Sequence, residues 1–197
     1  MMYRGRKTII SMIGISMLLI LFLMIRPLRG KDPLCIIEVC SNNFSTGIKE
    51  NYESSDWIEL YNSADKEIFL GDYYLSDDKY KMKKCKLPDV YIEAGGFYVL
   101  YATGVENGED SDLNFKISSN GEFIYLTKED QIVDSVGVPS LEMNVTWSRI
   151  DNNKEEWQKT EATIGMTNVN AVIIPDYKVE APVFSRAGGF YDEPFYL

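Results

Sequence analysis

The stretch Asp56-Trp57-Ile58-Glu59-Leu60-Tyr61-Asn62 contains a short β-like run, Trp57–Asn62, which passes directly into the turn signal Asn62-Ser63-Ala64-Asp65. Comparable runs lie on both sides of it, separated by turn residues. We expect them to form strands at Leu34–Cys40, Glu67–Leu70, Tyr73–Ser76, Gly96–Ala102, Asn114–Ser118, Glu122–Lys128, Gln131–Val138, Asn144–Ile150 and Trp157–Thr160. No stretch after residue 31 keeps a helical period over three turns. The sequence therefore predicts an all-β, antiparallel sandwich.

Two tight reversals are expected in the middle of the chain. Asn120-Gly121 suits a two-residue hairpin turn, because this dipeptide readily adopts positive φ angles. We expect it to join Asn114–Ser118 to Glu122–Lys128. A second reversal at Glu129-Asp130 would then lead into Gln131–Val138, which completes a three-stranded meander.

Composition removes several classes of enzyme. The 197 residues include no histidine, so catalytic systems built on imidazole and zinc sites that need a histidine ligand are excluded. Residues 1–31 carry six basic side chains and no acidic one, whereas the remaining 166 residues carry 14 basic and 30 acidic side chains. A folded region with a net charge of −16 repels phosphate backbones, so we expect no nucleic-acid partner.

An apolar segment near the N-terminus predicts a membrane anchor. Residues 8–25, TIISMIGISMLLILFLMI, contain no charge, and as a helix they would span roughly 27 Å, close to the hydrocarbon core of a bilayer. A cleaved signal peptide is the alternative. The length of the run and the absence of a small-residue cleavage site favour the anchor. We place the short N-terminal tail in the cytoplasm and the folded domain outside the cell membrane, as a single-pass protein.

The ordered set of sequence blocks resembles a bacterial lamin-tail domain, which is an immunoglobulin-like β-sandwich. The stretch Asp56–Asn62 carries this resemblance and follows an opening strand at Ile36–Val39; the resemblance covers roughly Leu34 to Asn168. One departure is Ile164, at a position before Gly165 where the family usually has proline. The residues that carry the family motif, for which the resemblance implies structural roles, are Asp56, Trp57, Glu59, Asn62, Leu75, Ser76, Gly95, Gly96, Asn114, Gly121, Asp134, Gly165 and Asn168.

The C-terminal stretch carries a second resemblance. Residues 181–195 resemble the opening strand and turn of the small β-domain that precedes the kinase-like domain in bacterial surface proteins of the spore-coat-H (CotH) type. We therefore divide the chain into a tail, anchor and basic flank at 1–31, a lamin-tail domain at 32–168, and a linker with the first strand of an incomplete domain at 169–197.

Other candidate sites have simpler explanations. Asp56 and Glu59 do not suit acid/base chemistry, since a spacing of three on a strand places them on opposite faces; we expect each to hold a loop amide or a neighbouring strand. The acidic loop with Glu106, Glu109, Asp110 and Asp112 has calcium-type ligands, but a solvated loop is favoured over a Ca²⁺ site. The basic run Tyr80–Lys86 is favoured as a solvated hairpin over a contact with an anionic surface.

The three cysteines leave two alternatives open. Cys35 and Cys40 lie five residues apart on one expected strand, so they should point to opposite faces and not bond to each other. Cys85 pairs with Cys35 or with Cys40, or all three remain buried free thiols.

The resemblance implies a module without catalysis or cofactors. We expect no metal site and no catalytic residues in this chain. The expected function is binding or tethering at the cell surface, with a protein or a cell-wall polymer as partner. The alternative is the N-terminal anchor and spacer of a larger, kinase-like surface protein.

Overall fold

The computed structural model describes residues 31–47, 54–151 and 156–176. These residues form eleven strands and two 3-10 helices. In chain order the elements are β1 (Leu34–Cys40), β2 (Trp57–Asn62), β3 (Ile68–Phe69), η1 (Leu70–Asp72), β4 (Tyr73–Ser76), β5 (Cys85–Lys86), β6 (Tyr91–Ile92), β7 (Phe97–Tyr101), β8 (Glu122–Lys128), β9 (Gln131–Val138), β10 (Thr146–Arg149), β11 (Trp157–Thr160) and η2 (Asn168–Asn170).

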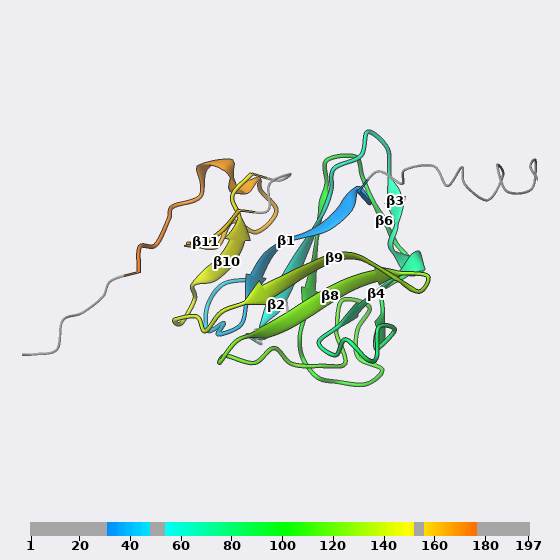
Figure 1. Cartoon of the computed structure of the whole chain (residues 1–197), viewed down its shortest axis with the longest axis horizontal. Helices are drawn as coiled ribbons and strands as arrows, with labels where there is room; N and C mark the ends of the chain where they lie inside the picture. The colour runs from blue at the N-terminus through cyan, green and yellow to red at the C-terminus, as the bar shows by residue number, and fades with distance from the viewer. Residues whose placement is uncertain (1–30, 48–53, 152–155, 177–197) are drawn as a thin grey trace, which may run out of the picture.

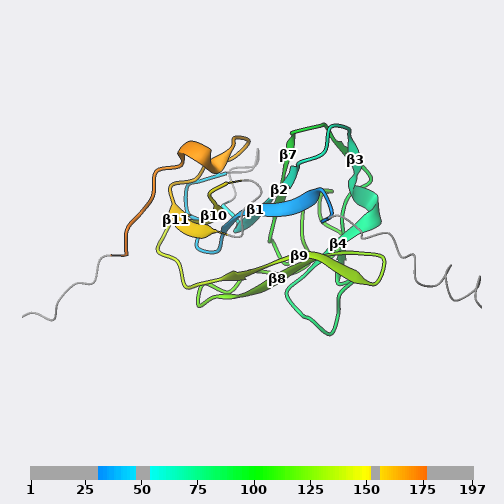
Figure 2. The same ribbon diagram turned by 45° about the horizontal axis from the view of Figure 1, so that its top comes forward.

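Two antiparallel sheets face each other (Figures 1 and 2). The larger sheet has the strand order β11-β10-β1-β2-β7, and the smaller has the order β5-β4-β8-β9. A two-stranded sheet, β3-β6, lies beside them. The all-β sandwich predicted from the sequence is confirmed.

One buried apolar cluster joins the two main sheets. The larger sheet contributes Ile36 and Leu60, and the smaller contributes Leu75, Ile124 and Leu126, all of them fully buried. Along each strand these residues alternate with ones that face outward, as the period of two in a β-strand requires.

Six strands begin and end where the sequence predicts: β1, β2, β4, β8, β9 and β11. Others differ. Residues 114–118 form no strand, so the hairpin expected at Asn120-Gly121 is not made; there Gly121 instead closes a turn, with its N–H donating to Ser118 O. Strands β5 and β6 were not predicted, because two-residue strands carry no periodic signal. The reversal at Glu129-Asp130 is confirmed by the pairing of Lys128 with Gln131.

A bulge in β1 corrects the expected direction of two cysteines. Between Ile36 and Glu38 the register against β2 shifts by one residue. Cys35 therefore pairs with Tyr61 and Cys40 with Trp57, and these two partners lie four residues apart on one face of β2. Because of the bulge, Cys35 and Cys40 point to the same face, which is the outer one, contrary to the prediction.

The predicted anchor at residues 8–25 lies outside the described residues. None of the helices in the described part of the chain is long and apolar enough to cross a membrane.

Candidate binding site

The residues of the Asp56–Asn62 motif hold loops in place. The Asp56 carboxylate accepts a hydrogen bond from Asn43 N at 3.0 Å, and the fully buried Trp57 donates through Nε1 to Thr46 Oγ1 at 3.2 Å. Asn62 Nδ2 contacts three carbonyl oxygens of two loops, those of Lys66, Ile92 and Glu93, at 2.8–3.0 Å. The motif is therefore a hub of loop hydrogen bonds.

Two loops on either side of this hub contain the motif glycines. Gly95 has φ +69° and its N–H donates to Asn62 O, while Asn62 N donates to Gly96 O. Gly165 has φ +73° and occupies the third position of a turn closed by Met166 N and Thr163 O. A positive φ at this position defines a type II turn and favours glycine. Ile164 precedes it, at the position where proline is common in such turns.

Two buried carboxyl groups hold the segment that follows β11 against the outer face of the larger sheet. Glu38 and Glu59 face each other across β1 and β2, and both are fully buried. Glu38 accepts from Thr163 N and Thr163 Oγ1, and Glu59 Oε1 accepts from Gly165 N at 2.7 Å. Asn168, also buried, donates to Ile37 O and Arg149 O.

Burial raises the pKa of Glu59 to about 8, and the neighbouring Glu38 charge adds to this shift, whereas the Gly165 N–H opposes it. Burial also raises the pKa of Glu38. Oε2 of Glu59 is buried without a hydrogen-bond partner. Asp56 and Glu59 do not meet at one point, and each holds a loop amide.

The remaining motif residues lie in or beside the smaller sheet. Leu75 is in the core, and Ser76 Oγ accepts from Asp78 N at 2.9 Å. Asn114 Nδ2 donates to Lys84 O. A Cβ on Gly121 would lie 2.7 Å from Val138 O, so the close approach of the backbone requires glycine.

The acidic loop and the basic run, the other candidates from the sequence, do not form a site in the described residues. The described residues contain no group of three or more His, Cys, Asp or Glu side chains that could hold a metal ion. In the basic run, Lys83 pairs with Asp130 and Lys84 with Asp77.

Of the two alternatives for the cysteines, the structure has the second: no disulfide joins Cys85 to Cys35 or Cys40, and all three cysteines are buried. Cys85 faces the core from the smaller sheet, whereas the other two point away from the core on the outer face of the larger sheet. Burial raises the pKa of both the Cys35 and the Cys40 thiols to about 11, which keeps them protonated and unreactive.

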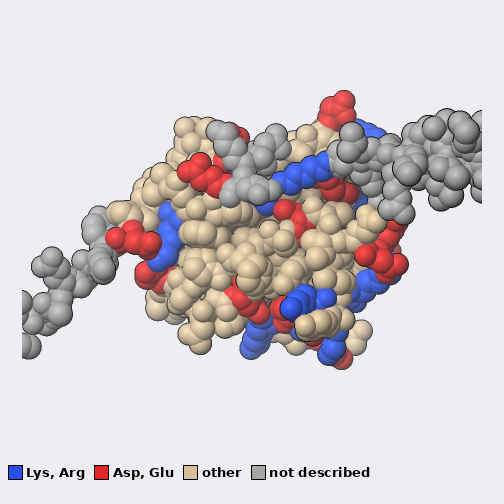
Figure 3. All heavy atoms as spheres, viewed as in Figure 1, with Lys and Arg blue, Asp and Glu red and all other residues tan. Residues whose placement is uncertain are grey.

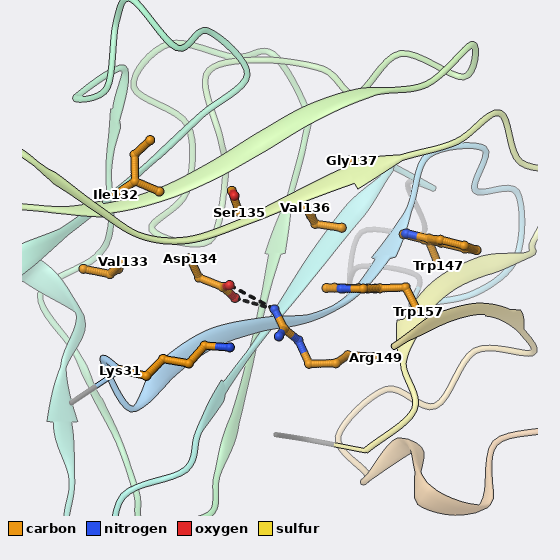
Figure 4. A pocket seen from close by; sticks show the side chains of 10 residues that line it. All are labelled: Lys31, Ile132, Val133, Asp134, Ser135, Val136, Gly137, Trp147, Arg149 and Trp157. Carbon is orange, nitrogen blue, oxygen red and sulfur yellow. Dashed lines mark hydrogen bonds and ion pairs between the residues drawn. The ribbon is translucent and has the colours of Figure 1, made fainter. Parts of the chain in front are cut away.

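An open slot separates the ends of the two sheets on one side of the sandwich. Strand β9 packs against β1, and no strand of the smaller sheet makes a comparable contact with β10 or β11. The inner face of β10 and β11 therefore extends beyond the smaller sheet. A cavity of about 570 Å³ lies there, which we call the slot; it is lined by Lys31, residues 132–137, Trp147, Arg149 and Trp157 (Figure 4).

A buried ion pair forms the floor of the slot. Arg149 Nη2 donates to both carboxylate oxygens of Asp134, at 3.0 and 2.7 Å, and both side chains are more than 90% buried. Arg149 Nε donates to Ile36 O, and Asp134 Oδ2 accepts from Ile36 N. The pair thus ties β9, β10 and the β1 bulge together.

The buried Arg149 side chain lies against the cavity. Its Nη1 makes no hydrogen bond within the described residues. Figure 4 shows the side chains of Arg149 and Lys31 approaching each other at the slot.

Two tryptophans form one wall of the slot. The rings of Trp147 and Trp157 stack with their centroids 6.5 Å apart, and the Arg149 guanidinium lies 4.8 Å from the centroid of the Trp157 ring. Paired tryptophans next to a guanidinium form a broad apolar surface with a cationic end.

The sequence analysis did not identify the slot. The one feature of the sequence that could have indicated it is Asp134, a charged residue in the same alternating buried positions of β9 as Val136 and Val138. A carboxylate in an inward position requires a partner, and Arg149 is the corresponding charge in β10. That they meet depends on how the two sheets are stacked, which no local pattern specifies.

The described residues thus form an immunoglobulin-like β-sandwich with a lateral slot. The family model described as Lamin Tail Domain matches residues 29–140, which is more than half of the chain, so the chain belongs to the lamin tail domain family. The matched residues end before β10, although β10 pairs with β1 and supplies Arg149. A search of curated proteins finds no match.

Proposed function

We propose that this lamin tail domain is a non-catalytic binding or tethering module, anchored in the cell membrane through residues 8–25 and displayed outside the cell. The observation that carries the binding role is the slot, a cavity lined by two stacked tryptophans and by the buried Arg149–Asp134 ion pair. The family-motif side chains that form hydrogen bonds hold loops and strands in place. The slot offers a cavity of about 570 Å³ in which a partner could be held.

The charge of the domain favours a protein partner over nucleic acid. Residues 32–197 have a net charge of −16, which repels a phosphate backbone. On the side shown in Figure 3, charged side chains lie mainly around the rim and the middle is largely uncharged, as is common at protein-binding surfaces. A cell-wall polymer is the other partner class that suits a tether.

Photo-cross-linking in the native cells tests this proposal. A benzophenone amino acid replaces Ile132, which lines the slot and is 48% exposed, in the full-length chain; the control places it at Tyr91 on β6, which is 59% exposed. We expect a discrete adduct from position 132 only. Digestion of the added mass by protease or by a wall hydrolase identifies the partner as protein or polymer. Equal labelling at both positions, or none at position 132, would contradict the proposal.

The alternative function is that the chain is the N-terminal anchor and spacer of a larger kinase-like surface protein. Its support is that residues 181–195 resemble the start of the β-domain that precedes the kinase-like domain in such proteins. This alternative predicts that the native protein isolated from its membrane has a mass tens of kilodaltons above 22.5 kDa.

A further inference from the structure

The segment that follows β11 crosses the outer face of the larger sheet, on the side away from the slot (orange in Figures 1 and 2). Residues 163–168 of this segment, which we call the latch, cover the buried carboxyl groups of Glu38 and Glu59. Asn168 adds a further side-chain contact, to carbonyl groups of β1 and β10. No backbone–backbone hydrogen bond joins residues 162–170 to the sheet within the described part of the chain. The latch can therefore leave the sheet without breaking the pairing of any strand.

The packing of the latch is also incomplete. Asn168 is the one buried residue of the latch, and Met166 is 60% exposed. A cavity of about 550 Å³ lies between Met166 and the paired rings of Tyr61 and Phe97, whose centroids are 5.0 Å apart. Segments with few buried apolar contacts open locally at a lower free-energy cost than the strands of a core. Opening of the latch thus does not require unfolding of the sandwich.

The surroundings of the two carboxyl groups supply no counter-charge among the described residues. On β7 the residue beside Glu59 is Val99, and the latch itself contains no charged side chain. The neutral polar groups that face the pair from β1, β10, β11 and the latch are those of Cys40, Thr146, Ser148, Gln158, Thr160, Thr163 and Asn168. A negative charge on Glu59 is therefore buried next to the other carboxyl group, Glu38, with no cation to balance it.

The hydrogen bonds of Glu59 fit a protonated carboxyl group better than a charged one. Oε1 accepts from Gly165 N, whereas Oε2 is buried without a partner. An ionised carboxylate accepts hydrogen bonds at both oxygens, and water can supply them to Oε2 once the latch has moved away. Burial and the neighbouring Glu38 raise the pKa of Glu59 to about 8. The closed latch thus favours the protonated form and the open latch favours the charged form.

We propose that residues 163–168 are a pH-sensitive latch, which is closed over Glu38 and Glu59 at acidic and neutral pH and opens at alkaline pH while the sandwich stays folded. In the open state both carboxylates are exposed to solvent, and the cavity beside Tyr61 and Phe97 loses the wall that the latch supplies. The latch and the slot lie on different faces of the larger sheet, so this device is additional to the proposed binding function and does not depend on it.

The test is hydrogen exchange of the full-length chain in detergent at pH values from 6 to 9. Mass spectrometry follows peptides that cover residues 161–170 and, as a reference, the central strand β8. Correction for the intrinsic pH dependence of amide exchange gives the opening constant of each segment. Because the open latch releases the Glu59 proton more readily, we expect its opening constant to rise by about tenfold or more between pH 6 and 9. The opening constant of β8 should change little.

Two variants with the same chemical change separate Glu59 from the other acidic groups. Glu59→Gln keeps an acceptor for Gly165 N but cannot ionise, so opening of its latch should not depend on pH. Glu161→Gln removes an exposed carboxylate two residues before the latch, and it should show the same rise as the natural chain.

Three results would overturn the latch. One is an opening constant of residues 161–170 in the natural chain that does not rise with pH. Another is a rise of equal size in Glu59→Gln, since the pH dependence would then come from another group. The third is an equal rise in β8, which would mean that alkaline pH unfolds the whole sandwich and does not open the latch alone.

Discussion

Arg149→Met is expected to lower the free energy of unfolding by about 3–5 kcal/mol, because it leaves the Asp134 carboxylate buried without its counter-charge. For a domain of this size the loss corresponds to a fall in melting temperature of roughly 10 °C or more. Chemical denaturation and thermal melting measure both quantities. The large effect follows from burial, since the same pair in water would contribute little.

A matched control lies in the same chain. Lys86 pairs with Asp89 at 2.7 Å, the same distance as the shortest contact of Arg149 with Asp134, but both side chains of this control pair are at least half exposed. Lys86→Met should change stability by no more than about 0.5 kcal/mol. Adding Asp134→Asn to Arg149→Met should cost less than the sum of the single changes. Equal losses of stability in Arg149→Met and Lys86→Met would show that the buried Arg149–Asp134 pair does not stabilise the fold more than a surface pair does.

Glu59→Gln is expected to stabilise the domain at alkaline pH and to leave its stability unchanged in acid. In the folded chain the pKa of Glu59 is about 8, above the ordinary value of 4.5, because burial and Glu38 disfavour the charged form. The unfolded chain therefore loses this proton first as the pH rises. The penalty on folding is absent below about pH 4.5, grows between 4.5 and 8, and then stays constant.

Glutamine stays neutral and still accepts the Gly165 N–H, so the variant escapes this penalty. We expect it to exceed the natural chain in stability by about 2–4 kcal/mol at pH 9. The measurement is urea unfolding of both chains from pH 4 to 9. Glu93→Gln, at an exposed position, is the control and should track the natural chain at every pH. A constant difference between the Glu59→Gln and natural chains at all pH values would refute the shifted pKa.

Local patterns predict much of the sandwich. Strands such as β2 and β9 carry alternation and adjacent turn residues, and both begin and end as predicted. The failures have physical reasons. Residues 114–118 have strand-like composition but form no strand, and the bulge in β1 moves Cys35 and Cys40 to one face without any sequence marker.

The slot was beyond the reach of such patterns. In the sequence, Trp147, Arg149 and Trp157 have no feature that distinguishes them from other residues of two neighbouring strands. They lie within the region of family resemblance, but no role follows from it. What makes them a site is the offset of one sheet over the other, which leaves β10 without a facing strand. The offset is a property of the packed core, and the inward Asp134 is its one trace in the sequence.

Hydrogen exchange of β9 tests most directly whether the slot is occupied when the protein is at work. The full-length chain is compared in detergent after purification and in its native membranes, by mass spectrometry of peptides covering residues 132–138 and 97–101. We predict that exchange of residues 132–138 slows at least tenfold in the native membranes. The β7 peptide should not change, because its edge is already covered by the chain itself. Equal exchange of residues 132–138 in both settings would contradict the account.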